Sequence, residues 1–152
     1  MRTGAFTFEV VRDNLASIGE EMVAELLRIA YSGVIRNAHD CGAAVLDRRG
    51  QLVAQRAGTP GHFNSITTAA RGMLEVIPLE TIEPGDVMLT NDPWLAAGHL
   101  NDFFMFTPCF VEGHAVGFCA TVAHQLDVGG RTRARRPRTP PSCSRRGSRS
   151  RC

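Results

Sequence analysis

Lysine is absent from this 152-residue sequence, so arginine supplies all 17 of its basic residues. No apolar run approaches the roughly 20 residues that a transmembrane helix needs, and the N-terminus lacks the apolar core of a secretory signal. The five cysteines are odd in number, and none forms a CxxC pair. These absences argue against a membrane span and a disulfide framework, and they favour a cytoplasmic protein with reduced thiols.

Two motifs of common enzyme classes are also missing. The sequence contains no GxxxxGK followed by Ser or Thr, so this chain offers no P-loop for ATP. It contains no GxSxG either, and nothing in it indicates a serine-hydrolase triad. Any phosphorylation by ATP would therefore need a second chain.

Charge divides sharply along the chain. Residues 1–130 hold eight Arg and all 15 acidic residues, a net charge of −7, whereas residues 131–152 hold nine Arg and no acid, a net charge of +9. One cooperative fold seldom divides its charge in this way. The basic segment has almost no apolar residues, which is typical of a disordered tail or a nucleic-acid arm.

Residues 1–130 show the patterns of a mixed fold. Apolar residues recur every three or four positions over 7–31, which predicts one long helix with a core-facing stripe of Phe8, Val11, Leu15, Ile18, Met22, Leu26 and Ile29. A second helix is predicted to begin at a cap on Asn64 or Ser65 and to stop at Pro78.

Strands are predicted between and after these helices. Residues 43–46 and 51–54 flank a turn and form a hairpin, 86–90 is a short strand, and 104–111 with 115–122 forms a second hairpin. Helices and strands alternate without a clear βαβ repeat. The sequence therefore predicts an α+β fold.

Two HxxD units lie within 30 residues of each other around the second hairpin. His99 and Asp102 form the first, His124 and Asp127 form the second, and Asp92 lies just upstream. Residues three apart face the same side in a turn, and the neighbouring glycines favour tight turns. A single HxxD is usually a surface turn, but two copies that flank one hairpin favour a shared site.

The residue types in this cluster indicate a metal. Two imidazoles with two or three carboxylates suit Mn²⁺, Fe²⁺ or Zn²⁺ and are too rich in nitrogen for a typical Ca²⁺ site. Elsewhere His39 and His62 have no partner at such a spacing, and His114 is expected in an exposed turn. Asp40, just before a strand, is ambiguous between a turn former and a site residue.

Several segments carry a resemblance to a known family, the hydantoinase B family. They are EVVRDNLASIGEEM at 9–22, AYSGVIR at 30–36, LDRRGQLVAQ at 46–55, PGDVMLTNDP at 84–93, GHLND at 98–102 and AHQLDVGG at 123–130. The match runs in order over about residues 6–130. The family includes the B-type component of ATP-dependent N-methylhydantoinases, the C-terminal half of 5-oxoprolinases and the α subunit of acetone carboxylase, all several times longer than this stretch.

The resemblance implies a division of labour between two subunits. ATP binding and phosphorylation of a small cyclic amide fall to an A-type subunit, and the B-type subunit holds a divalent metal. The implied ligands in this sequence are His99, Asp102 and His124, with Asp127 next in line. Asp92 and Asp40 are the candidate catalytic carboxylates. Trp94 and the segment at 37–41 depart from the family pattern, which leaves the substrate open.

The basic segment departs from the resemblance altogether. Family members continue after VGG with a segment similar to PGSxPxxATE, whereas this chain has RTRARRPRTPPSCSRRGSRSRC at 131–152. Back-translation with GC-rich codons and a shift of the frame gives DPGTSPADATELFQEGLAIPL. We therefore interpret 131–152 as out-of-frame translation, from a pseudogene, a truncated allele or a sequencing error, and expect it to be disordered.

Three functions follow from these observations. The first is a truncated B-type subunit of an ATP-dependent hydantoinase or 5-oxoprolinase, inactive alone, with no nucleic-acid or membrane partner. The second is a subunit similar to the α subunit of acetone carboxylase. The third is a non-enzymatic binding protein with a basic tail. The DNA sequence across codons 125–152 would discriminate among them.

Overall fold

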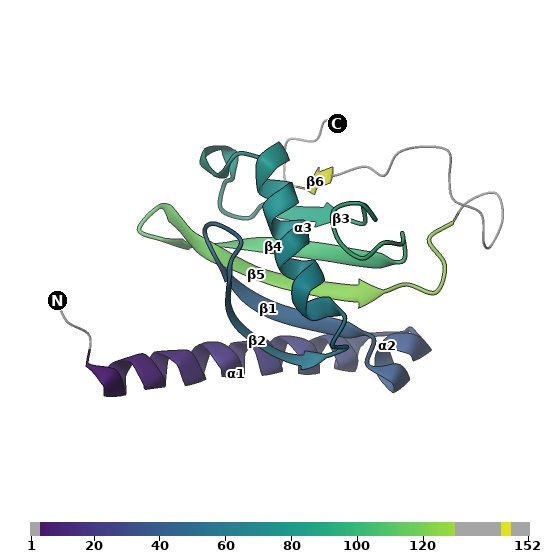
Figure 1. Cartoon of the computed structure of the whole chain (residues 1–152), viewed down its shortest axis with the longest axis horizontal. Helices are drawn as coiled ribbons and strands as arrows, with labels where there is room; N and C mark the ends of the chain where they lie inside the picture. The colour runs from purple at the N-terminus through teal and green to yellow at the C-terminus, as the bar shows by residue number, and fades with distance from the viewer. Residues whose placement is uncertain (1–3, 130–143, 147–152) are drawn as a thin grey trace.

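The fold is an antiparallel sheet with a helix against each of its two faces. The computed structural model describes residues 4–129 and 144–146. Within these residues the strand order is β2-β1-β5-β4-β3-β6, and every neighbouring pair is antiparallel. Figure 1 shows α3 crossing one face of the sheet, while α1 runs beside β1 and β2. The predicted α+β class is confirmed.

The order of the elements follows the sequence patterns. The helices are α1 (Ala5–Ile29), α2 (Gly33–Ala38), α3 (His62–Val76) and the 3-10 turn η1 (Leu79–Thr81). The strands are β1 (Cys41–Asp47), β2 (Leu52–Gly58), β3 (Val87–Thr90), β4 (Asp102–Val111), β5 (His114–His124) and β6 (Ser144–Arg146). Both predicted hairpins and the predicted short strand are present. No described helix is long and apolar enough to cross a membrane.

Helix α3 begins earlier than the sequence predicted. Its N-cap is Gly61, which provides no side-chain cap, and the amide of His62 donates to the carbonyl of Thr59 at 3.0 Å. The turn before Gly61 thus leads directly into the helix. The predicted cap at Asn64 or Ser65 is wrong, because both residues lie inside the first turn. His62 therefore stands at the very start of α3.

Strand β1 separates two hydrophobic clusters, because alternate residues of a strand face opposite sides. Ala44 and Leu46 join the larger cluster under α3, whereas Cys41 and Ala43 join a smaller cluster against α1. The largest buried side chains of the first cluster include Phe104, Phe106, Phe118, Ile66 and Met73. Burial of each such side chain contributes about 1.5–3 kcal/mol, so α3 and the β4–β5 hairpin are held firmly together.

One row of core residues runs along β4 to the end of the sheet at which β4 begins. Asp102, Phe104 and Phe106 alternate along β4, are all buried, and share the face that α3 covers. The register pairs Asp102 with His124 and Phe104 with Val122. The first residue of β4 and the last residue of β5 therefore lie side by side, at the end of an apolar row.

The apolar stripe of α1 is only partly covered. Val23 is buried, and Met22 and Leu26 pack against the smaller cluster. Phe8, at 63% exposed, and Val11, at 49%, lie in the half of the helix that precedes these contacts. The prediction that the whole stripe packs in the core is wrong for these residues and for Ile18 and Ile29, because the smaller cluster takes up only the α1 residues around Val23.

The basic segment lies mostly outside the described residues. Its exception is β6, which pairs with β3 through Val87↔Arg146, Met88↔Arg145 and Leu89↔Ser144. Such strand pairing uses backbone groups and needs no apolar side chains, and the disorder expected for 131–152 stays a prediction. The change of reading frame after residue 130 stays a prediction.

Two cysteines lie near the turn of the β4–β5 hairpin, at the end opposite Asp102. The sulfur atoms of Cys109 and Cys119 are 3.7 Å apart. Burial, followed by the neighbouring Cys109, raises the pKa of Cys119 to about 11. Close by, a Cβ atom on Gly117 would clash with the carbonyl oxygen of Leu46 on β1, so β5 and β1 approach too closely there for any side chain.

We expect Gly117→Ala to lower the free energy of unfolding by about 1–3 kcal/mol, because the backbone of β1 or β5 must move to admit the methyl group. Gly33→Ala is the matched control, since its Cβ would meet only Asn37 Nδ2 at 3.7 Å. It should change stability by less than about 1 kcal/mol. Urea unfolding measures both, and equal effects would contradict the close approach of the two strands.

We expect Cys119 to react with iodoacetamide at pH 8 about a hundred-fold more slowly than a free thiol, because its thiolate fraction is smaller by that factor. Its folded pKa is raised above the unfolded value, so its contribution to stability is complete below about pH 9 and is lost toward pH 11. Peptide mass spectrometry measures the rate at each cysteine. Cys109→Ser should leave Cys119 slow, and a rate near that of glutathione would contradict the burial.

Candidate metal centre

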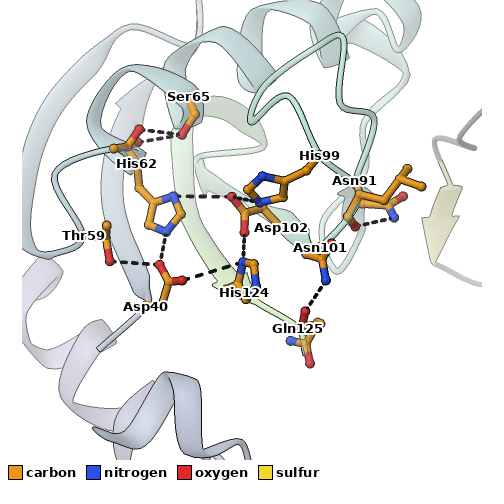
Figure 2. Close-up of polar contacts among 12 residues, drawn as sticks. Asp40, Thr59, His62, Ser65, Asn91, His99, Asn101, Asp102, His124 and Gln125 are labelled. Carbon is orange, nitrogen blue, oxygen red and sulfur yellow. Dashed lines mark hydrogen bonds and ion pairs between the residues drawn. The ribbon is translucent and has the colours of Figure 1, made fainter. Parts of the chain in front are cut away.

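Two carboxylates and three imidazoles meet where β4 begins and β5 ends (Figure 2). Asp102 is the first residue of β4 and His124 the last of β5, while His99 lies in the loop before β4. Asp40 precedes β1, and His62 begins α3. Residues from five segments of the chain thus converge at one end of the sheet.

Asp102 is at the centre of this group. Its side chain is only 3% exposed. Its Oδ1 lies 2.8 Å from His124 Nδ1, and its Oδ2 lies 3.0 Å from His99 Nε2. A buried carboxylate is costly unless it is hydrogen-bonded or paired with charge, and the two imidazoles satisfy one oxygen each.

The three residues offer a donor set that suits a first-row divalent metal. Each of the three residues His99, Asp102 and His124 offers one ligand atom, and these three atoms lie within 4.8 Å of one another. The rings of His99 and His124 stand edge to face, with centroids 5.3 Å apart. Two imidazole nitrogens and a carboxylate oxygen fit Mn²⁺, Fe²⁺ or Zn²⁺. His99 is 49% exposed and His124 25%, so an ion there would be reached from solvent.

Asp40 is a second carboxylate beside this group. Its Oδ1 accepts a hydrogen bond from Thr59 Oγ1 at 3.0 Å and lies 3.1 Å from His62 Nε2. Its Oδ2 is 3.7 Å from His124 Nδ1. Burial alone raises the pKa of Asp40, but these two hydrogen bonds and the charges of His124 and His62 lower the pKa by more, so the net shift is downward.

The chain makes an unusual turn to place Asp40. His39, the C-cap of α2, has a φ of 55°, a left-handed conformation that non-glycine residues seldom adopt. Its carbonyl accepts from the amide of Cys41 at 2.8 Å and from Thr59 Oγ1 at 3.3 Å. The amide of His124 donates to the carbonyl of Asp40 at 3.0 Å. These bonds fix Asp40 between α2 and the end of β5.

The loops around the site are anchored by two asparagines. Asn91 Nδ2 donates to the carbonyl of Leu100 at 3.0 Å, which closes the loop that carries His99. Asn101 Nδ2 donates to the carbonyl of Gln125 at 2.7 Å, and the amide of Gln125 returns a bond of 2.8 Å to Asn101. The segments before β4 and after β5 are therefore tied to each other next to the site.

The other two predicted site residues are not brought into this group. Asp127 is exposed, and its Oδ1 accepts from the amide of Gly129. Asp92 Oδ1 accepts from the amide of Trp94. In the part of the chain that the structure describes, both carboxylates thus shape their own turns. The metal and the catalytic roles stay predictions.

Sequence reasoning missed His62, which is 7% exposed and faces both carboxylates. It lies 22 residues from Asp40 and 40 from Asp102 in sequence, so no local spacing relates it to either residue. The proline–glycine turn before α3 was the only signal that could have placed it at a helix start. The HxxD spacing also suggested Asp127 as the partner of His124, whereas the pairing of β4 with β5 places Asp102 beside His124.

Comparisons with known proteins agree with the resemblance seen in the sequence. A family model described as Hydantoinase B/oxoprolinase matches residues 4–147. The putative B-type component of a D-/L-hydantoinase from Pseudomonas sp. (strain NS671) is 34% identical over 129 residues, which cover 83% of this chain and 22% of that protein. The chain thus spans about a fifth of the length of this relative.

Two solved structures share the fold. The crystal structure of an ATP-dependent caprolactamase from Pseudomonas jessenii matches 94% of this chain and 26% of its own, with a TM-score of 0.81 at 27% identity. A nucleotide-free acetone carboxylase matches 82% of this chain and 16% of its own, with a TM-score of 0.73 at 20% identity. From its sequence motifs, its fold and these matches, the chain belongs to the hydantoinase B/oxoprolinase family.

Proposed function

We propose that this chain carries the divalent-metal site of a B-type subunit that acts with an ATP-binding A-type subunit on a small cyclic amide. The observation that supports the metal most directly is the convergence of His99, Asp102 and His124 within 4.8 Å. Structural packing alone would not require two imidazoles around a buried carboxylate at the end of an apolar row.

Each residue would have a distinct part in this site. Asp102 would hold Mn²⁺, Fe²⁺ or Zn²⁺ from the buried side, while His99 and His124 would hold it toward solvent. When bound, such an ion polarises a carbonyl or activates water. Asp40, whose Oδ2 lies 3.7 Å from His124 Nδ1, would be the carboxylate beside the metal that is left to accept a proton.

The substrate class and the partner rest on the relatives. One is named as the B-type component of a hydantoinase, another is an ATP-dependent caprolactamase, and the family name includes oxoprolinase. Hydantoins, caprolactam and 5-oxoproline are all ring amides. Since this chain has no P-loop, an A-type subunit would bind ATP. The cytoplasmic location remains part of the proposal and rests on the free cysteines.

A carboxylase similar to acetone carboxylase is the second candidate. The structural match to that enzyme is 20% identical, which shows a shared fold and no more. The more similar relatives act on ring amides by name, so hydrolysis is the better proposal. Metal binding would separate both enzymes from the third candidate, a basic-tailed binding protein.

We expect the chain to bind one Mn²⁺ or Zn²⁺ ion per molecule, and we expect His124→Ala to weaken this binding at least about tenfold, because one of three protein ligands is lost. Asp102→Asn should have a similar effect. Isothermal titration calorimetry measures the stoichiometry and the affinity.

His114→Ala is the matched control for the ligand variants. His114 is exposed at the start of β5, next to the hairpin turn and away from the site. Its loss should leave the affinity within about twofold of the wild type. Equal weakening by His114→Ala, or no binding by the wild type, would refute the proposed metal site.

We expect the 152-residue chain alone to hydrolyse neither hydantoins nor 5-oxoproline, with or without ATP, because it spans only about a fifth of its relative and contains no P-loop. A gene with the reading frame restored after codon 130, co-expressed with an A-type subunit, should show ATP-dependent ring opening. His99→Ala should then abolish it. Chromatography of the ring-opened product measures the rate of ring opening. Ring opening by the chain alone would contradict the proposed location of the active site.

A further inference from the structure

His62 closes a ring of alternating acidic and imidazole side chains. Figure 2 shows contacts from His62 to Asp40, from Asp40 to His124, from His124 to Asp102 and from Asp102 back to His62. The two contacts of His62 measure 3.1 Å from Nε2 to Asp40 and 3.9 Å from Nδ1 to Asp102. Of the four members, His62 alone comes from α3, the helix that covers the core.

We propose that His62 is a positioning residue: it fixes the orientation of Asp40, whose Oδ2 lies 3.7 Å from the proposed ligand atom His124 Nδ1, and the negative charge held there raises the affinity of the neighbouring site for its metal. The proposal rests on the proposed function for the existence of that metal. His62 itself is not assigned as a ligand. It acts through the carboxylate that it holds.

The position of the imidazole is fixed from the backbone outward. The next turn of α3 places Ile66, at 1% exposed, in the main core, and Ser65 Oγ donates to the carbonyl of His62 at 3.2 Å. A Cβ on Gly42 would lie 3.5 Å from the Cβ of His62, so the helix start rests closely against β1. The ring is therefore held by a rigid element, which makes it suited to orient another side chain.

The hydrogen-bond pattern fixes Asp40 in one orientation. An ionised carboxylate only accepts hydrogen bonds, so His62 Nε2 carries the proton that faces Asp40 Oδ1. Thr59 Oγ1 donates to the same oxygen at 3.0 Å. Because both donors bind Oδ1 of Asp40, its other oxygen, Oδ2, stays directed at His124. Without His62, only Thr59 would donate a hydrogen bond to Oδ1, and the carboxylate could rotate away from His124.

The test compares Mn²⁺ affinity by calorimetry for His62→Ala, His62→Gln and the control His114→Ala. Loss of an outer partner typically costs about 10–100-fold in metal affinity, so His62→Ala should bind more weakly by that factor. His62→Gln retains a donor that reaches Asp40 and should lose less than about tenfold. Thermal unfolding, measured in parallel, corrects for any unfolded fraction. Wild-type affinity in His62→Ala would overturn the proposal.

A double-mutant cycle separates positioning from a general structural effect. If His62 acts through Asp40, then adding His62→Ala to Asp40→Ala should weaken Mn²⁺ binding by less than about twofold further. Independent, additive losses would show that His62 acts by another route and would overturn the proposal.

A metal-free measurement keeps the two proposals distinguishable. Long-range ¹H–¹⁵N spectra of the apo chain should show His62 as the Nε2–H tautomer, and Asp40→Ala should release that preference. An Nδ1–H tautomer would overturn the role of His62 whatever the metal result. Failure of the wild type to bind Mn²⁺, with the Nε2–H tautomer present, would instead defeat the proposed function and remove the metal-affinity role with it.

Discussion

The arrangement of this fold around its site depends on one buried carboxylate. Asp102 continues the apolar row of Phe104 and Phe106 and is 3% exposed, a place where packing alone would favour another apolar residue. An ionised group in that position costs several kcal/mol unless it is paired. His99 and His124 supply the pairing at 3.0 and 2.8 Å. The same environment that makes Asp102 costly to bury would make it a strong ligand for the proposed metal, because little water competes for its oxygens.

The sheet and its two helices serve to bring partners to this carboxylate. The register of β4 and β5 places His124 beside Asp102, and the loop closed by Asn91 carries His99. His62 lies near Asp102 because it is the first residue of α3. Asp40 follows the left-handed residue His39, which ends α2 and turns the chain into β1. The site is thus assembled from segments that are distant in sequence, and each is fixed by hydrogen bonds or by the core under α3.

Much of the fold could be predicted from the sequence, because apolar periodicity and turn residues determine helices and hairpins locally. The HxxD pairs identified His99, Asp102 and His124 as neighbours for a partly mistaken reason: the first pair does converge, but Asp102 and His124 meet through strand register. Asp127 satisfies the same spacing and bonds within its own turn. His62 could not be predicted, since its contacts depend on how α3 packs across the sheet. The exposed residues of α1 escaped prediction too, because periodicity shows an apolar face without showing its partner.

The central claim is that His99, Asp102 and His124 share one divalent ion. Anomalous X-ray diffraction from crystals grown with Mn²⁺ tests it most directly. We predict a single strong peak about 2.0–2.2 Å from His99 Nε2, His124 Nδ1 and an oxygen of Asp102, with Asp40 beside it and Asp127 remote. A peak held by other residues, or the absence of any peak at saturating Mn²⁺ while the three side chains keep their positions, would contradict it.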